Sequence, residues 1–88
     1  MSWTSEAIRS ELIRVFAQHN QTNAAVVESS ELVADLGIDS LGVMEVLAEL
    51  EDTFKLTIPD DALREVNTVA DVAKAVEKRL AQDGRFAG

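Results

Sequence analysis

The chain has 88 residues, of which 47% are apolar, with no cysteine, one histidine and a formal net charge of −8. This length allows one small domain with a thin core, and the composition is that of a folded chain rather than a disordered one. The lack of cysteine excludes disulfides, thiolate metal sites and cysteine nucleophiles, and no metal site is expected. Because we find neither a long apolar run nor a secretory signal, we expect a cytoplasmic protein that does not insert into membranes.

The acidic residues are concentrated in the middle of the chain. Between Glu28 and Glu65 there are eleven Asp and Glu residues, against only Lys55 and Arg64 as bases. Such a segment repels the phosphate backbone of nucleic acids and attracts basic protein surfaces. We therefore expect no nucleic-acid partner. The alternative to a docking surface is a solvated face that keeps a small protein soluble.

Helical spacing of apolar residues predicts a first helix from about Ser5 to Gln18, with Thr4 as its N-cap. A long connection follows, to about Asp39. A loop of this length in a small domain is usually functional or held in place by its apolar side chains. The apolar stripe of the helix consists of Ile8, Leu12, Val15 and Phe16. The irregularly spaced apolar residues of the loop are Val26, Leu32, Val33, Leu36 and Ile38.

A second helix is predicted from Ser40 to Phe54, with Asp39 as its cap. Its exposed face carries Glu45, Glu49 and Asp52 at helical spacing, with Glu51 beside them. Like charges at this spacing cost about 0.2–0.5 kcal/mol per pair, so something other than stability favours them. The core stripe of this helix consists of Val43, Val46, Leu47, Leu50 and Phe54.

The rest of the chain predicts one or two helical turns over residues 60–66 and a last helix from Val69 to about Ala81, begun by a capping box of Thr68 and Asp71. The fold class is therefore all-α: a four-helix bundle of three long helices and one short one, with a long loop between the first two. Residues 1–88 form one domain, with a core of about residues 4–81 and a flexible tail over residues 82–88. Because no apolar stripe is left over, we expect a monomer.

The segment from Asp35 to Leu41 carries the chemistry. Gly37 permits a backbone conformation that a side chain would resist, and Asp39 caps the helix. Ser40 is then the first helical residue, and the N-terminus of a helix stabilises an anion. A phosphate ester on the Ser40 hydroxyl would be tolerated there, although Asp35 and Asp39 oppose it.

At this point the sequence resembles the acyl carrier proteins. The likeness begins with Asp35-Leu36-Gly37-Ile38-Asp39-Ser40-Leu41 and continues through Glu45, residues 50–54, residues 58–60 and residues 68–72 at the expected spacing. It covers roughly Ile8 to Leu80. In that family the Asp-Ser-Leu motif marks the serine that receives 4′-phosphopantetheine from coenzyme A.

The resemblance implies that Ser40 is the attachment site and that Asp39 and Leu41 flank it in the recognition motif. It implies a carrier without catalytic residues, loaded by a phosphopantetheinyl transferase, that holds acyl groups as thioesters for partner enzymes of fatty-acid, polyketide or related biosynthesis. Basic patches on those enzymes would bind to one set of residues of this chain: Leu41, Met44, Glu45, Glu49, Glu51 and Asp52. The acyl chain would shelter among a second set: Val43, Val46, Leu47, Leu50, Phe54, Ile58 and Val69.

Several alternatives stay open. Gly42 stands where many fatty-acid carriers have an acid, and residues 19–22 are wholly polar, which leaves room for a specialised acyl carrier or an aminoacyl or peptidyl carrier. A helical adaptor without a prosthetic group is a further alternative, and Leu41 could be an ordinary core residue. An enzyme with Ser40 as nucleophile is rejected, because His19, the only histidine, precedes the long loop and the nucleophile-elbow spacing is absent.

Overall fold

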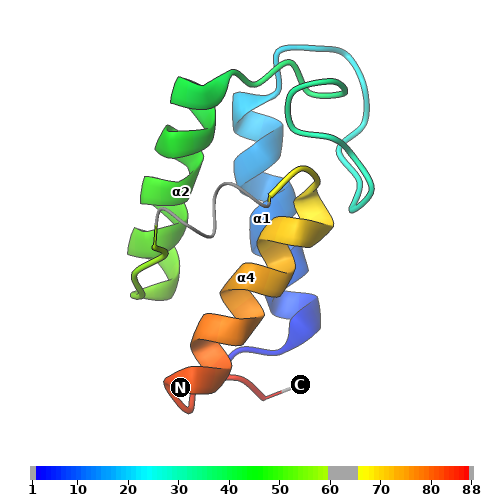
Figure 1. Cartoon of the computed structure of the whole chain (residues 1–88). Helices are drawn as coiled ribbons and strands as arrows, with labels where there is room; N and C mark the ends of the chain where they lie inside the picture. Colours follow the sequence, from blue (N-terminus) through cyan, green and yellow to red (C-terminus); the bar gives the residue numbers. More distant parts are fainter. Residues whose placement is uncertain (1, 60–65, 88) are drawn as a thin grey trace.

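The computed structural model describes residues 2–59 and 66–87, and its regular elements are three α-helices. These are α1 (Ser5–His19), α2 (Ser40–Phe54) and α4 (Val69–Gln82), close to the predicted bounds. Figure 1 shows α1 running opposite to α2 and α4, and α1 packs against both. The short helix predicted over residues 60–66 lies almost wholly outside the described residues. The described helices place the end of α1 and the start of α2 at the same end of the molecule (Figure 1).

Each helix begins at a side chain that accepts a hydrogen bond from a backbone N–H of the first turn. Thr4 accepts from Ala7 N at 3.1 Å in α1, as predicted. At α4, Thr68 Oγ1 accepts from Asp71 N at 3.2 Å, and the Asp71 carboxylate accepts from Thr68 N at 3.0 Å. This reciprocal pair is the predicted capping box, and it satisfies donors that the helix cannot use itself.

The Asp71 carboxylate makes the start of α4 sensitive to pH. Hydrogen bonds from the backbone N–H groups of Asn67 and Thr68 lower the pKa of Asp71 from its ordinary value of 3.8. Because these bonds favour the charged form in the folded state, their stabilisation is present above the ordinary pKa. It is lost as the pH falls through the lower folded-state pKa.

We therefore expect Asp71→Asn to reduce the free energy of unfolding at pH 7 by about 1 kcal/mol, the usual size of a capping contribution. The deficit should shrink as the pH falls below 4, where the wild-type carboxylate becomes protonated. Urea unfolding at pH 7 and pH 3 would measure both values. A deficit that is the same at both pH values would contradict the role of the carboxylate.

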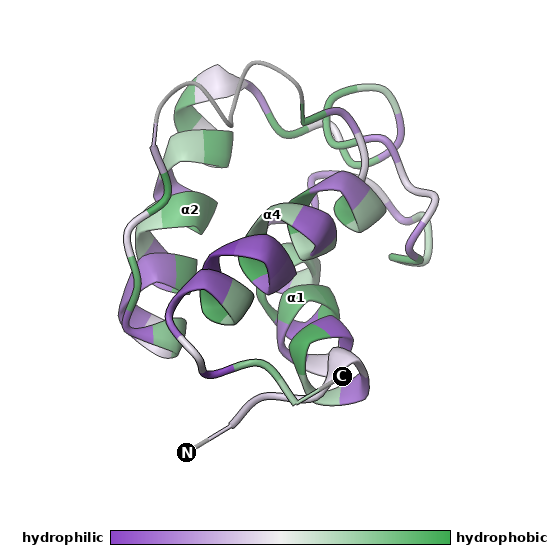
Figure 2. Cartoon of the chain, turned by 60° about the horizontal axis from the view of Figure 1, so that its bottom comes forward, coloured by the Kyte–Doolittle hydropathy of each residue, from purple (hydrophilic) through white to green (hydrophobic). Residues whose placement is uncertain are grey.

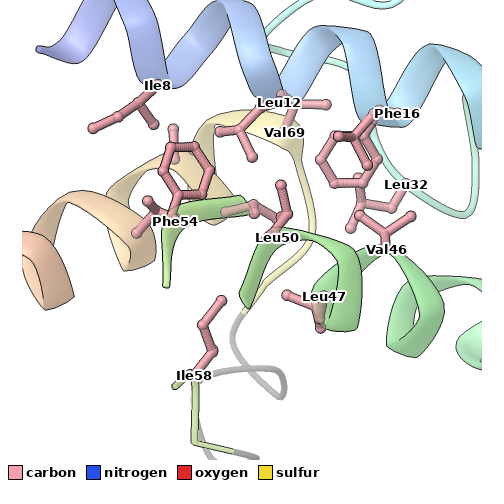
Figure 3. Close-up of a cluster of buried hydrophobic side chains, with 14 of the residues drawn as sticks. Ile8, Leu12, Phe16, Leu32, Val46, Leu47, Leu50, Phe54, Ile58 and Val69 are labelled. Carbon is pink, nitrogen blue, oxygen red and sulfur yellow. The ribbon is translucent and has the colours of Figure 1, made fainter. Parts of the chain in front are cut away.

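The core lies where the apolar stripes of the three helices meet, and Figure 2 shows these stripes facing inward. Figure 3 shows side chains of all three helices in one cluster with Leu32 and Ile58, which come from the connecting segments. The fully buried large side chains of the cluster are Ile8, Leu12, Val15, Phe16, Leu32, Leu36, Val46, Leu50, Phe54, Val69, Val72 and Leu80. No helix within residues 2–59 and 66–87 has the length and apolarity needed to cross a membrane.

Residues 20–39 join α1 to α2 and are held against the bundle. Leu32, Leu36 and Ile38 are buried in the core, whereas Val33 is exposed. One backbone bond closes the segment on itself, because Gln21 N donates to Leu36 O at 2.8 Å, and another ties it to the start of α4, because Val69 N donates to Ser30 O at 3.0 Å. These contacts hold the segment immediately before Ser40 in a defined path.

Residues close to the two termini meet at the end of the molecule opposite the start of α2 (Figure 1). Trp3 N donates to Arg85 O at 2.7 Å, and the Trp3 ring meets Phe54 edge to face with ring centroids 4.5 Å apart. The Arg85 guanidinium donates to the carbonyls of Phe54 and Lys55 at the C-terminus of α2. A cation at a helix C-terminus is favourable because it faces the negative end of the dipole. The sequence pattern of residues 82–88 gave no sign of these contacts.

Candidate functional site

Ser40 is exposed at the first position of α2. Asp39 directly before it has extended backbone angles, and its Oδ1 accepts from Gly42 N at 2.8 Å, so it is the predicted N-cap. The first turn of α2 therefore begins at a defined residue, with the positive end of its dipole at Ser40.

Gly37 and Ile38 decide where Ser40 comes to lie. Gly37 has φ +66°, a left-handed conformation that glycine adopts without the strain of a side chain. Ile38 is buried directly after it, and its N–H donates to Leu32 O at 2.9 Å. The chain is thus anchored two residues before Ser40, and the serine is exposed on a rigid support.

An open groove of about 360 Å³ borders Ser40. The residues on either side of the serine line it, together with the end of α1 and the first turns of α2. The lining residues are His19, Gln21, Gly37, Ile38, Asp39, Leu41, Gly42 and Glu45. The wall therefore combines amide, imidazole, carboxylate and apolar groups.

The structure gives a steric reason for a glycine at position 42, which the sequence did not reveal. A Cβ added at this position would lie 2.7 Å from Cγ2 of Ile38, a distance that real Cβ atoms essentially never show. Because Ile38 is buried, its side chain cannot move aside without disturbing the core. The glycine accordingly allows close packing at the start of α2, in addition to removing an acid from this face.

Two large apolar side chains next to Ser40 are on the surface. Leu41 is 64% exposed and Met44 is 58% exposed. The alternative that Leu41 is an ordinary core residue is therefore wrong. Exposed apolar residues of this size beside a charged face are common at protein-binding surfaces.

The four acids of α2 do not share one environment. Glu45 and Asp52 are exposed, and Asp52 makes only a 3.4 Å surface contact with Lys55. Glu51 accepts a 2.8 Å hydrogen bond through Oε2 from the backbone N–H of Ile58, which holds the segment after α2. Glu45 and Asp52 are therefore the exposed acids of this face, whereas Glu51 has a structural contact.

Glu49 is partly buried, and one of its two carboxylate oxygens faces α1. Its Oε2 lies 3.5 Å from Nε2 of His19, is buried, and makes no hydrogen bond in the structure. The His19 side chain is only 27% exposed. Sequence reasoning gave His19 no role, because 30 positions separate it from its partner and nothing in the local pattern connects them. The structure places this histidine between Glu49 and the groove at Ser40.

The residues expected to shelter an acyl chain come together in one region. Six of them are buried in the core cluster, and Val43 packs against it at its edge. Figure 3 shows residues of α2 and α4 in this cluster, with Ile58 beside them. The buried members are Val46, Leu47, Leu50, Phe54, Ile58 and Val69.

The surroundings of Ser40 fit a phosphate ester that carries a flexible polar arm. The serine is exposed at a helix N-terminus, where backbone dipoles favour an anion, and an open groove runs beside it. Asp39 and Glu45 are unfavourable neighbours for a phosphate inside the groove, but they do not block the exposed hydroxyl. The exposed Ser40 hydroxyl at the start of α2 is therefore accessible for esterification.

Comparisons with known proteins agree with this geometry. A family model described as the phosphopantetheine attachment site matches residues 10–76. An acyl carrier protein of Wolinella succinogenes is 41% identical over 63 residues, which cover 72% of this chain and 83% of the relative. An acyl carrier protein of Sulfurovum sp. is 43% identical over 63 residues, which cover 72% and 84%. A solved structure of a proposed acyl carrier protein from Mycobacterium tuberculosis has a TM-score of 0.62 and 33% identity, covering 82% of this chain and 92% of that one.

The fold and the site thus define a phosphopantetheine-dependent carrier. The chain belongs to the acyl carrier protein family, as the motif around Ser40 predicted. Its function is that of an acyl carrier, and its prosthetic group is a covalently attached 4′-phosphopantetheine. Members of this family are modified by phosphopantetheinyl transferases and work with partner enzymes.

Proposed function

We propose that Ser40 carries the 4′-phosphopantetheine and that the holo-protein delivers acyl thioesters to enzymes of fatty-acid, polyketide or related biosynthesis. The observation that carries this proposal is the position of Ser40, exposed at the start of α2 and inside the matched region. Transfer from coenzyme A would form a phosphodiester on Ser40 Oγ and release adenosine 3′,5′-bisphosphate. The bound group supplies a terminal thiol that forms a thioester, so the chain itself needs no cysteine.

The chain's own residues would then position the arm without doing chemistry. Asp39 holds the first turn of α2, and buried Ile38 anchors the chain before the serine. Leu41 and Asp39 flank Ser40, where a transferase would read them as part of its recognition motif. Catalysis would belong to the partner enzymes.

The apolar and acidic surface of α2 would be the docking site for those enzymes. Leu41 and Met44 supply exposed apolar contacts, and Glu45 and Asp52 supply exposed charge for basic patches. Glu49 and Glu51, expected to act in the same way, would contribute less because their carboxylates face other parts of the chain. Acyl chains would shelter among Val43 and the buried residues of α2, α4 and Ile58 defined above.

Charge reversal tests whether the exposed acids of α2 take part in docking, and the quantity measured is the rate at which a transferase loads the protein. We expect the variants Glu45→Lys and Asp52→Lys each to lower the second-order loading rate several-fold at low salt, with a smaller effect at high salt. Glu6→Lys, on the exposed first turn of α1, is the control with the same change of charge. Equal loading of all three variants at low salt would remove the docking role.

The finer features of the fold belong to the same proposal. We expect the chain to form one domain with a core of residues 4–81, to complete a four-helix bundle with a short helix over residues 60–66, and to act as a cytoplasmic monomer. An acyl cargo is favoured over an aminoacyl one because Asp39, not histidine, precedes Ser40.

The direct test is the intact mass before and after incubation with coenzyme A and a broad-specificity phosphopantetheinyl transferase. We expect an increase by one phosphopantetheine group. If transferases of several classes all leave a folded sample unchanged, the proposal fails in favour of a helical adaptor.

A further inference from the structure

The groove beside Ser40 is on the α1 side of the attachment site, and its wall is formed by parts of the chain that are distant in sequence. His19 and Gln21 come from the end of α1 and the residues after it, whereas Leu41 and Glu45 come from α2. Asp39 and Leu41 both line the groove, so it adjoins the position of Ser40, although Ser40 itself is not one of its lining residues. Its volume of about 360 Å³ is within the range of small-molecule sites, about 300–1,000 Å³.

The wall has the chemistry of a site for a neutral polar chain rather than for an anion. Gln21 Nε2 donates to His19 O at 3.3 Å, which leaves its second N–H and its oxygen for other partners. The carboxylates of Asp39 and Glu45 can accept hydrogen bonds from N–H and O–H groups. The same carboxylates repel a phosphate. Ile38 and Leu41 add apolar surface. Pantetheine has matching parts: two amides, one hydroxyl and a pair of methyl groups, all uncharged.

The wall of the groove is closely packed at its two glycines. A Cβ at Gly37 would lie 3.3 Å from Cβ of Gln21, and a Cβ at Gly42 would lie 2.7 Å from Cγ2 of Ile38. His19 also lines the groove, and its Nε2 atom lies 3.5 Å from Oε2 of Glu49 on α2. The wall of the groove thus includes residues of α1 and α2 that approach one another.

We propose that the pantetheine part of the arm on Ser40 lies in this groove against His19 and Gln21, with its phosphate at the exposed start of α2. This inference rests on the proposed attachment at Ser40. The resting arm is then held on the α1 side of the site and leaves the groove when a partner enzyme draws the thiol into its own active site.

The test is NMR spectroscopy of the loaded protein, with loading first established by intact mass so that a failure of attachment is recognised separately. We expect nuclear Overhauser contacts between the pantetheine methyl protons and the side chains of His19 and Gln21. We also expect changes of the Gln21 and His19 signals between the apo and holo forms. Residues 38–42 are not diagnostic, because they adjoin the modified serine.

Gln21→Ala should remove the nuclear Overhauser contacts between the pantetheine methyl protons and His19. It should also reduce the difference between the apo and holo signals of His19 by at least half. The backbone bond from Gln21 N to Leu36 O does not depend on the side chain, so the fold should persist. The variant also loses the bond from Gln21 Nε2 to His19 O, so its holo form is compared with its own apo form. Gln18→Ala, an exposed glutamine of α1 that does not line the groove, is the matched control and should leave the contacts unchanged. The proposal is overturned if fully loaded protein shows changes only at residues 38–42, or if Gln21→Ala leaves the His19 contacts as they are.

Discussion

Ser40→Ala is expected to abolish loading by a phosphopantetheinyl transferase while leaving the protein folded. Alanine lacks the hydroxyl oxygen that would form the phosphodiester, so no rate remains to be measured. The effect on stability should be within about 0.5 kcal/mol, because Ser40 is exposed and its neighbour Asp39 keeps the cap of α2. Intact mass after prolonged incubation with coenzyme A measures the loading, and thermal unfolding followed by circular dichroism measures the fold.

The control for this variant is Ser10→Ala, which removes an exposed serine from α1 and should be loaded at the wild-type rate. A mass increase on Ser40→Ala equal to that of the wild type would show that the attachment point is elsewhere. Loss of loading in both variants would point to a general defect of the samples and not to Ser40. The pair thus tests the hydroxyl itself.

Leu50→Ala is expected to reduce the free energy of unfolding by about 2–5 kcal/mol, the usual cost of removing a buried leucine side chain. Leu50 is 0% exposed in the centre of the cluster in Figure 3. A domain of this size has a total stability of about 5–10 kcal/mol, so this single change removes a large share of it. Urea unfolding followed by circular dichroism gives the difference directly.

Leu41→Ala is the matched comparison, because it makes the same chemical change in the same helix at a position that is 64% exposed. We expect a change in the free energy of unfolding within about 0.5 kcal/mol. Its effect should appear instead as slower loading, since Leu41 flanks Ser40. If the two variants were destabilised equally, the assignment of inner and outer faces to α2 would be wrong.

The comparison of Leu50 with Leu41 shows that the two faces of α2 have different roles. Its inner face contributes Val46, Leu47 and Leu50 to the core, and this packing holds the helix in place. Its outer face exposes Leu41 and Met44, which we propose to contact partner enzymes. A stable inner face would then hold this surface and Ser40 in one geometry for each of those enzymes.

The local features of this protein could be predicted from the sequence. The three described helices, the caps at Thr4 and Asp39 and the capping box at Thr68 all depend on residues within four positions of one another. Backbone hydrogen bonding and helical periodicity operate over that range, so the pattern of side chains is sufficient. The motif around Ser40 is equally local, so the family could be inferred from the sequence alone.

The contacts between distant residues were decided by the tertiary structure. Glu49 and Glu51 look like docking acids in the sequence, but one faces His19 on α1 and the other binds Ile58 N after the helix. The contacts of Arg85 with the end of α2 and the groove beside Ser40 likewise join segments far apart in the chain. Such contacts depend on how the helices are rotated and set against each other, and this is determined by packing of the whole core rather than by any local pattern.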